Sequence, residues 1–303
     1  GVGRVSSLFV YPMSFDEFLL ATGQQGLWRA KQDCNSGRPL LKAFYEKLVE
    51  AFRSFMLVGG MPEAVAAYAQ TGSYRASSDI VNEILLGYED DFAKYSAKAN
   101  PVLLRQTLVS VAHQVGAKFV YSRVEGQYRS AEVKTALEML RDAGLIIPAY
   151  HTDANGIPLG AEINERVVKY LVHDSGILLA LLGIDDDTES LIKELMVENV
   201  ADLVDKGNVA EMIAGLEIMK CYSPQKRHQL YYWQNMNKGT CAEVDYIIAQ
   251  GSRIVPIEVK SGVKGSMSSM YSLMKNPQKH IGRGVRCSLE NFGSFLSPDG
   301  KAI

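Results

Sequence analysis

The sequence predicts a mixed α and α/β protein, in which a helical N-terminal part precedes an α/β domain. Three observations support this prediction. Residues 1–99 carry helix-starting and helix-breaking signals, residues 100–183 have the order helix, helix, strand, turn, strand, and residues 207–303 place a helix before three strands. A chain of 303 residues is long enough for two or three such modules. The polar stretch at residues 185–188 makes residues 184–206 the predicted linker.

The helical N-terminal part begins with a capping box. Ser14 and Glu17 have the required spacing, which predicts a helix from Phe15 to about Ala21. Further helices are predicted over residues 40–57, 63–68 and 79–95. Residues 2–11 have a strand-and-turn pattern but no earlier segment to pair with, so we expect this chain to follow another domain in a longer protein.

Residues 100–183 have the element order of a winged helix. The expected elements are helices over 101–115 and 130–142 and strands over 145–150 and 167–172. The second helix of such a module can enter a DNA major groove, where it would present Arg129, Lys134 and Arg141. Winged helices also serve as packing units, so DNA contact and a purely structural role are both open.

The net charge of −2 conceals an uneven distribution. Residues 206–303 carry 13 Lys and Arg against 7 Asp and Glu, a balance of +6, which leaves −8 for residues 1–205. The basic end, with Lys226 and Arg227, is therefore the candidate binder of a polyanion, although such an asymmetry also serves solubility alone.

Several functional classes are disfavoured by composition. No apolar run approaches the roughly 18 residues of a membrane helix and no signal segment is visible, which predicts a soluble cytoplasmic protein without a membrane partner. The four widely separated cysteines suggest reduced thiols. No two histidines have metal-ligand spacing on one helix face, so a metal is expected to be a hard cation bound by oxygen.

Residues 207–303 contain the candidate chemistry. A helix after Gly207 carries Glu211 at the margin of its apolar side, and Gly215 one turn later is expected to let another backbone approach closely. Three strands are predicted after this helix, over 230–233, 243–248 and 253–260, with a hairpin turn at Gly251-Ser252.

Strand alternation places Glu258 and Lys260 on one face, with the apolar residues between and before them on the other. The hairpin brings Asp245 alongside Glu258, and two neighbouring carboxylates call for a cation between them. Mg²⁺ (or Mn²⁺) fits, since it takes carboxylate oxygens and activates water, while a nearby lysine stabilises charge on a phosphate. The alternative is an ion pair of Lys260 with Glu258 or Asp245 on an exposed sheet face.

These residues resemble the PD-(D/E)xK nuclease superfamily, whose core is helix, three-stranded meander, helix, strand. The resemblance implies a second helix over residues 266–275 and a last strand over 284–288. It also implies metal ligands at Glu211, Asp245 and Glu258, and catalytic roles for Asp245, Glu258 and Lys260.

Over nearly its full length the chain is similar to the C-terminal part of prokaryotic AAA-type ATPases that carry a C-terminal domain of unknown function. The motifs that carry this similarity are Gly3-Arg4-Val5, the run from Tyr11 to Phe18, Gly59-Gly60-Met61-Pro62-Glu63, Ala242-Glu243-Val244-Asp245 and the run from Pro256 to Gly262.

The family resemblance implies an ATP-binding domain in front of this chain, with Arg4 near its end. The sequence has no Gly-x-x-x-x-Gly-Lys-Ser/Thr loop, so ATP is expected only in that missing domain. The implied partners are nucleic acid, with DNA favoured, and the ATPase domain in cis; a homo-oligomer is open. Two functions follow: a Mg²⁺-dependent nuclease-like enzyme, or a non-catalytic DNA-binding, regulatory or oligomerisation module.

Overall fold

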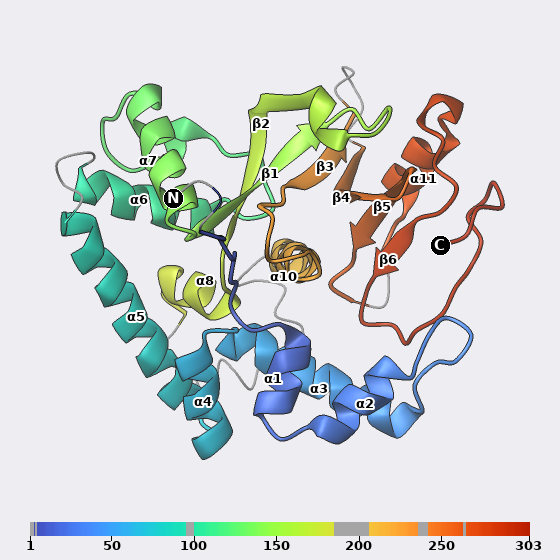
Figure 1. The fold of residues 1–303 in the computed structure, drawn as a ribbon, viewed down its shortest axis with the longest axis horizontal. Coiled ribbons are helices and arrows are strands. Elements are labelled where there is room, and N and C mark those ends of the chain that lie inside the picture. Colours follow the sequence, from blue (N-terminus) through green and yellow to red (C-terminus); the bar gives the residue numbers. More distant parts are fainter. Residues whose placement is uncertain (1–2, 4, 95–99, 185–205, 236–241, 263–264) are drawn as a thin grey trace.

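A computed structural model describes residues 3, 5–94, 100–184, 206–235, 242–262 and 265–303. This part of the chain contains ten α-helices and one six-stranded mixed sheet (Figure 1). The predicted mixture of α and α/β structure is therefore confirmed as a class. Arg4 and most of the predicted linker over 184–206 lie outside the described residues.

The N-terminal part is helical, as predicted. Its helices are α1 (Phe15–Ala21), α2 (Gln25–Gln32), α3 (Lys42–Val58), α4 (Pro62–Thr71) and α5 (Tyr74–Lys94). The predicted capping box is confirmed, because the Glu17 N–H donates to Ser14 Oγ at 3.3 Å and the Ser14 N–H donates to Glu17 Oε2 at 2.7 Å. Helix α2 was not predicted. The strand predicted over 2–11 is wrong where the structure describes it, because residues 5–11 belong to no strand. The Phe9 N–H instead donates to the Pro224 carbonyl at 2.8 Å.

The middle of the chain follows the predicted order. It contains α6 (Pro101–His113), the short 3₁₀ helix η1 (Tyr121–Arg123), α7 (Ser130–Asp142), β1 (Ile146–Thr152), the 3₁₀ helix η2 (Leu159–Glu162), β2 (Ile163–Val172) and α8 (Ser175–Leu181). Helix α7 buries an apolar stripe formed by Val133, Ala136, Leu137 and Leu140. Helix, helix and hairpin are thus present, while their assignment as a winged helix stays a prediction.

The C-terminal part also has its predicted element order. It contains α10 (Lys206–Lys220), β3 (Leu230–Gln234), β4 (Glu243–Gln250), β5 (Arg253–Val259), α11 (Ser268–Lys275), the 3₁₀ helix η3 (Pro277–Lys279) and β6 (Val285–Cys287). The apolar positions of α10 are buried, as the helical spacing predicted.

One sheet runs through the middle and C-terminal parts, in the strand order β2-β1-β3-β4-β5-β6. β1 pairs with β2 antiparallel and with β3 in parallel, through Ala149↔Leu230, Tyr150↔Tyr231 and His151↔Tyr232. The hairpin predicted as part of residues 100–183 therefore extends the sheet of the following segment. As a result, side chains from β2 reach the helix that packs on β3 to β5.

Helices α10 and α11 cover opposite faces of this sheet. On β3, Tyr232 belongs to the large core with α10, and its neighbour Trp233 belongs to the smaller core with α11. α10 is also held from below by the N-terminal helices (Figure 1), because the Phe15 N–H donates to Glu217 Oε2 at 3.2 Å and Lys220 Nζ donates to the Met13 carbonyl at 2.9 Å. The central helix is thus fixed on two sides.

The Gly59-Gly60 pair explains two of the sequence motifs structurally. The Met13 N–H donates to the Gly60 carbonyl at 2.7 Å, and the Gly60 N–H donates to Asp174 Oδ2 at 2.6 Å. A Cβ on Gly60 would lie 2.3 Å from the Met13 carbonyl oxygen, and Gly59 has a φ of +78° with Asp174 Oδ1 2.3 Å from the place of its Cβ. These glycines therefore allow the entry to α1, the α3–α4 turn and the start of α8 to meet.

Candidate functional site

The β4–β5 hairpin places Asp245 where the two strands separate. The strands pair from Gln250↔Arg253 to Tyr246↔Ile257, around the predicted turn at Gly251-Ser252, and the pairing does not continue to Asp245. Instead, Asp245 Oδ2 accepts a hydrogen bond from the Val259 N–H at 2.7 Å. The Asp245 carboxylate therefore accepts the hydrogen bond that a backbone carbonyl of β4 would accept in a continuous ladder. This bond fixes the carboxylate at the end of the hairpin.

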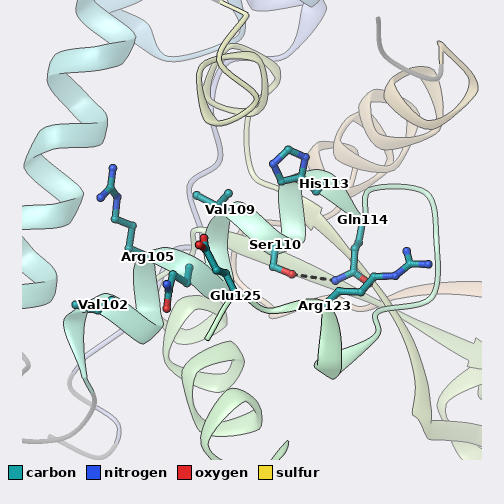
Figure 2. A pocket seen from close by; sticks show the side chains of 9 residues that line it. Val102, Arg105, Val109, Ser110, His113, Gln114, Arg123 and Glu125 are labelled. Atoms are coloured by element: carbon teal, nitrogen blue, oxygen red, sulfur yellow. Dashed lines mark hydrogen bonds between the residues drawn. The ribbon is translucent and has the colours of Figure 1, made fainter. Parts of the chain in front are cut away.

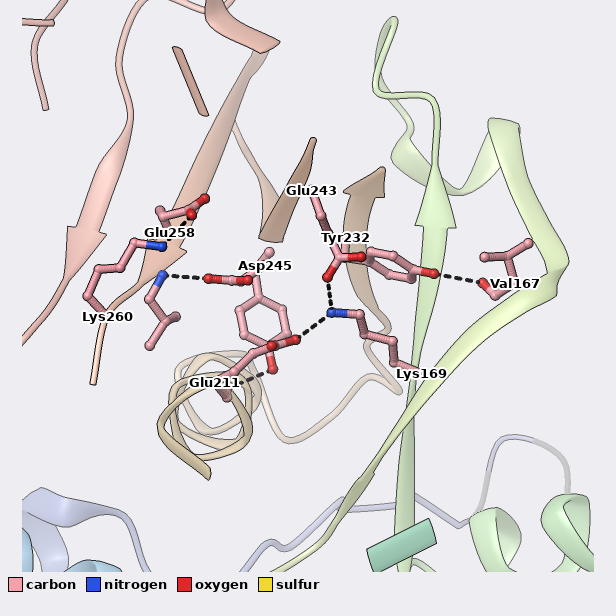
Figure 3. Close-up of polar contacts among 10 residues, drawn as sticks. Val167, Lys169, Glu211, Tyr232, Glu243, Asp245, Glu258 and Lys260 are labelled. Carbon is pink, nitrogen blue, oxygen red and sulfur yellow. Dashed lines mark hydrogen bonds and ion pairs between the residues drawn. The ribbon is translucent and has the colours of Figure 1, made fainter. Parts of the chain in front are cut away.

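Three carboxylates meet at this point. Glu211 from α10 and Glu243 and Asp245 from β4 each offer an oxygen, and these oxygens all lie within 4.8 Å of one another (Figure 3). We call these three residues the acidic cluster. Glu211 is buried and the other two are half-buried. Carboxylate oxygens at this spacing are suited to a hard divalent cation.

Lys169, on β2, is the cation that contacts the acidic cluster in the described part of the chain. Its Nζ donates to Glu211 Oε1 at 2.8 Å and also to Glu243 Oε1, and it lies 4.9 Å from the centre of the Tyr232 ring. Only 3% of the side chain is exposed. Burial alone would lower the pKa of the Lys169 ammonium, but Glu211 and Glu243 raise it above its ordinary value.

The carboxylates remain electrostatically strained despite this lysine. Burial raises the pKa of Glu211 to about 8; Lys169 opposes the rise and Asp245 adds to it. Burial also raises the pKa of Asp245, against the stabilising hydrogen bond from the Val259 N–H. One ammonium therefore leaves this group of carboxylates short of positive charge.

Glu258 and Lys260 form a second pair at the end of β5. Lys260 Nζ donates to Glu258 Oε1 at 2.6 Å, as the shared strand face predicted. The Glu258 side chain is 6% exposed, and its Oε2 has no hydrogen-bond partner among the described residues. Burial, with Asp245 as the second cause, raises the pKa of Glu258 to about 7. A buried, unpartnered oxygen beside another carboxylate indicates a place for a further cation or donor.

The predicted ligand set and the observed cluster differ by one residue. Glu211, Asp245 and Glu258 were predicted, and Asp245 does lie close enough to raise the pKa of both of the others. The group whose oxygens could share one ion contains Glu243 in place of Glu258. The reason is local, since Asp245 faces the Val259 N–H and α10 while Glu258 turns to Lys260 (Figure 3). The role of Glu258 as a ligand stays a prediction.

Glu243 and Lys169 were both missed from the sequence. A signal for Glu243 existed, because it lies two positions before Asp245 and strand alternation puts such residues on one face. Lys169 offered only a weak signal, a lysine inside an apolar strand whose partners lie on distant segments. The sequence alone does not show which carboxylate such a lysine meets.

Gly215 makes room beside the cluster, although not for a backbone as predicted. A Cβ at this position would lie 2.3 Å from the Tyr246 hydroxyl and 2.7 Å from Leu171 Cδ2. The Tyr246 hydroxyl donates to the Glu211 carbonyl at 2.8 Å. The glycine therefore lets the Tyr246 and Leu171 side chains approach α10, and the Tyr246 hydroxyl bonds the helical turn that carries Glu211.

Two of the predicted nucleic-acid-binding residues come together in space. Arg141, at the end of α7, donates through Nε to Asp142 Oδ1 at 3.0 Å, and Arg227 Nη1 lies 3.6 Å from the same oxygen. These arginines lie on segments that the sequence separates widely. Asp142 neutralises one of the two arginines, so the group of Arg141, Arg227 and Asp142 has a net charge of +1.

The other three predicted cations are exposed and more dispersed. Arg129 is at the N-terminal boundary of α7, twelve positions before Arg141, which corresponds to about 18 Å along a helix. Lys134 lies between them with Glu138 at 3.9 Å, and Lys226 is on the loop after α10. α7 therefore presents its cations along its length and not as one cluster.

A separate pocket of about 600 Å³ lies on α6 (Figure 2). It is lined by Val102, Arg105, Gln106, Val109, Ser110, His113, Gln114, Arg123 and Glu125. Glu89 pairs with Arg105 at 2.7 Å, and Glu125 adds a second carboxylate, so the charge of the two arginines is balanced. None of the five predicted nucleic-acid-binding residues lines this pocket.

The structure also bears on membrane association and thiol chemistry. Among the described helices, none combines the length and the apolar character needed to cross a bilayer. Cys34, Cys221 and Cys287 are free thiols, and Cys241 lies outside the described residues.

Two family models match this chain, and the gap between the two matches falls within the predicted linker. Residues 49–188 match a domain of unknown function, DUF8612, and residues 206–294 match a second one, DUF4143. No curated protein and no solved structure matches the chain. Lys169 therefore belongs to the first matched segment and the acidic cluster to the second. DUF4143 is a domain typically found in the C-terminal region of AAA-ATPase-associated proteins, which agrees with the resemblance seen in the sequence motifs.

Proposed function

We propose that this chain is the C-terminal part of an AAA-type ATPase and carries a divalent-metal-dependent site that cleaves nucleic-acid phosphodiesters. One observation supports it most: Glu211, Glu243 and Asp245 hold their oxygens within 4.8 Å of one another around a partly buried point. The element order helix, three strands, helix, strand is compatible with a PD-(D/E)xK nuclease-like domain over 207–303.

The donor set fits Mg²⁺ or Mn²⁺. Glu211, Glu243 and Asp245 would hold the ion. Glu258, whose pKa Asp245 helps to raise, has an Oε2 without a hydrogen-bond partner among the described residues. When bound to carboxylates, such an ion lowers the pKa of water and offsets negative charge on a phosphate. Histidine and cysteine are absent from this set, so the chemistry favours a hard cation over zinc.

The protein's own residues have separate tasks in this proposal. Asp245 is held by the Val259 N–H, so its free oxygen faces Glu211 and Glu243. The Lys260 ammonium donates to Glu258 Oε1 at 2.6 Å. The Lys260 side chain is 21% exposed. Lys260 can therefore donate to a phosphate oxygen that arrives from solvent, which would stabilise the charge that builds there during attack by water.

The substrate is proposed to be DNA. Residues 206–303 have a charge balance of +6, and Arg141 and Arg227 bring cations from α7 and from the loop after α10 to one place. Phosphate contacts of this kind orient a duplex without reading its sequence. An ATPase domain in front of this chain, as the family resemblance implies, would drive or gate access to the site.

A second candidate function is a non-catalytic DNA-binding, regulatory or oligomerisation module. The observation that favours it is the position of Lys169, which already donates to two of the three carboxylates. In that case the acidic cluster is a structural ion-pair network that fastens α10 to β2 and β4.

A cleavage assay separates these functions. Linear, nicked and single-stranded DNA are incubated with Mg²⁺ or Mn²⁺ and with the parent protein, Glu243→Gln, Glu258→Ala or Lys260→Ala. Glu46→Gln is the matched control, because this exposed carboxylate pairs with Lys42 on α3 and belongs to neither the acidic cluster nor the Glu258–Lys260 pair. We expect at least a roughly 100-fold loss in the three site variants and none in the control. Equal cleavage by all five proteins would remove the site from the reaction.

A further inference from the structure

Lys169 contacts two of the three carboxylates that could hold a metal ion. Its Nζ donates to Oε1 of Glu211 and to Oε1 of Glu243, and both residues belong to the group that could share one cation. The lysine side chain is 3% exposed, and the Glu211 side chain is 11% exposed. This ammonium is therefore an internal counter-ion of the acidic cluster.

An ammonium and a divalent cation satisfy these carboxylates in different ways. The Lys169 Nζ donates hydrogen bonds to these oxygens. Mg²⁺ instead requires carboxylate oxygens at about 2.0–2.1 Å and in near-octahedral positions. Two positive centres at the same oxygens also repel each other, and the repulsion is strong where water is excluded. Both cations cannot be bound at full strength to the same pair of carboxylates.

A second observation indicates that the cluster is not satisfied by Lys169 alone. The Glu258 side chain is 6% exposed, and its Oε2 has no hydrogen-bond partner in the described part of the chain. Asp245, a member of the acidic cluster, lies near enough to Glu258 to raise the pKa of its carboxyl group, after burial as the larger cause (Figure 3). A cation near Asp245 would relieve both the unpartnered oxygen and the repulsion among the carboxylates.

We propose that the Lys169 ammonium and a divalent cation compete for the Glu211 and Glu243 carboxylates, so that metal binding requires Lys169 to release them. This inference rests on the proposed metal site. It makes Lys169 a positioning residue that holds the cluster together before metal arrives. Lys169 is carried by β2, the edge strand, so any partner that shifts the β1–β2 hairpin would change metal affinity.

Mn²⁺ binding to the full chain tests this competition. Free Mn²⁺ is measured by electron paramagnetic resonance for the parent protein, for Lys169→Met, which keeps a similar length without the charge, and for Lys169→Arg, which keeps the charge. Lys42→Met, an exposed lysine paired with Glu46, is the control. We expect Lys169→Met to bind Mn²⁺ at least tenfold more tightly than the parent protein, and Lys169→Arg and Lys42→Met to show no gain.

Folding of Lys169→Met provides a second measurement. Without the Lys169 ammonium, the folded protein should be less stable than the parent protein in EDTA, and Mn²⁺ should restore stability. The measurement is the rise in Tm on adding Mn²⁺, which should be larger for Lys169→Met than for the parent protein. A variant that stays unfolded in both conditions would overturn the proposal, because Mn²⁺ is expected to replace the lost ammonium.

The outcomes distinguish this inference from the proposed function. If the parent protein binds Mn²⁺ and Lys169→Met binds it no better, the competition is wrong and the metal site stands. If only Lys169→Met binds Mn²⁺, the competition is right and metal-dependent cleavage by the parent protein is contradicted. If neither binds Mn²⁺, both proposals fail.

Discussion

Lys169 Nζ lies 2.8 Å from Glu211 Oε1, although 42 positions separate the two residues and a different family model matches each of them. The contact is made possible by the parallel pairing of β1 with β3, which joins the β1–β2 hairpin to the sheet beneath α10. The acidic cluster is thus assembled from both matched segments, and its stability and chemistry depend on their packing.

The stability of the protein should fall as the buried carboxylates ionise. The pKa of Glu211 is raised from 4.5 to about 8, so the folded state binds a proton that the unfolded state has lost. The contribution of Glu211 protonation to the free energy of unfolding is complete below pH 4.5 and is lost as pH rises through about 8. Urea unfolding in EDTA should give a free energy lower by about 1 kcal/mol at pH 8.5 than at pH 7. Glu211→Gln should flatten this change, and an equally steep change in that variant would contradict the assignment.

Gly215→Ala should destabilise the protein, whereas the same change at Gly87 should stabilise it. Both glycines are in helices, where alanine is favoured by about 1 kcal/mol. A Cβ at Gly87 meets nothing within 4 Å, but at Gly215 it would press on Tyr246 and Leu171 and cost about 1–3 kcal/mol. Chemical denaturation of the two variants measures the difference. Equal gains in stability would show that Tyr246 does not need this space.

Asp174→Ala should cost more stability than Asn100→Ala. Both side chains cap a helix, since Asp174 Oδ1 accepts from the Ile177 N–H at 3.1 Å and Asn100 Oδ1 accepts from the Val102 N–H at 3.0 Å. Loss of a cap costs about 1 kcal/mol. Asp174 also accepts from the buried Gly60 N–H, so its loss should add about 1–3 kcal/mol. Equal losses in thermal or urea unfolding would contradict a special role for the Gly60 contact.

DNA binding, if it uses α7, should depend on its exposed cations. Replacing Arg129 and Lys134 together by alanine should lower affinity and reduce the slope of log K against log salt by about 2. The control is the double replacement of Arg29, on α2, and Arg38, after α2, which are both exposed. In Figure 1, α2 and α7 lie at opposite sides of the molecule. Fluorescence anisotropy at several salt concentrations gives both values. An unchanged slope would leave α7 as a packing element.

Much of the fold was predictable because its signals are local. The capping box at Ser14 and Glu17 determines the start of α1, and the apolar stripe of α7 is written at helical spacing within residues 130–142. The pairing of Glu258 with Lys260 follows from strand alternation alone. In each of these cases the residues that interact are close in sequence.

The remaining features depend on contacts between distant segments. The place of Lys169 requires β1 to pair with β3, and no pattern in either strand specifies that partner. Glu243 replaces Glu258 in the cluster because the β4–β5 pairing ends before Asp245, which strand periodicity does not predict. α2 was missed because it is only eight residues long and its N-cap residue, Gln24, makes no side-chain cap, so the sequence carries no start signal for this helix.

The central claim is that Glu211, Glu243 and Asp245 form a divalent-metal site. Crystals of the protein soaked in Mn²⁺ and measured for anomalous scattering test it directly. We expect one anomalous peak within coordination distance of all three carboxylates, about 2.0–2.2 Å for a hard divalent ion, with Lys169 displaced from Glu211 and Glu243. Crystals without such a peak, in which Lys169 still donates to both carboxylates, would contradict it.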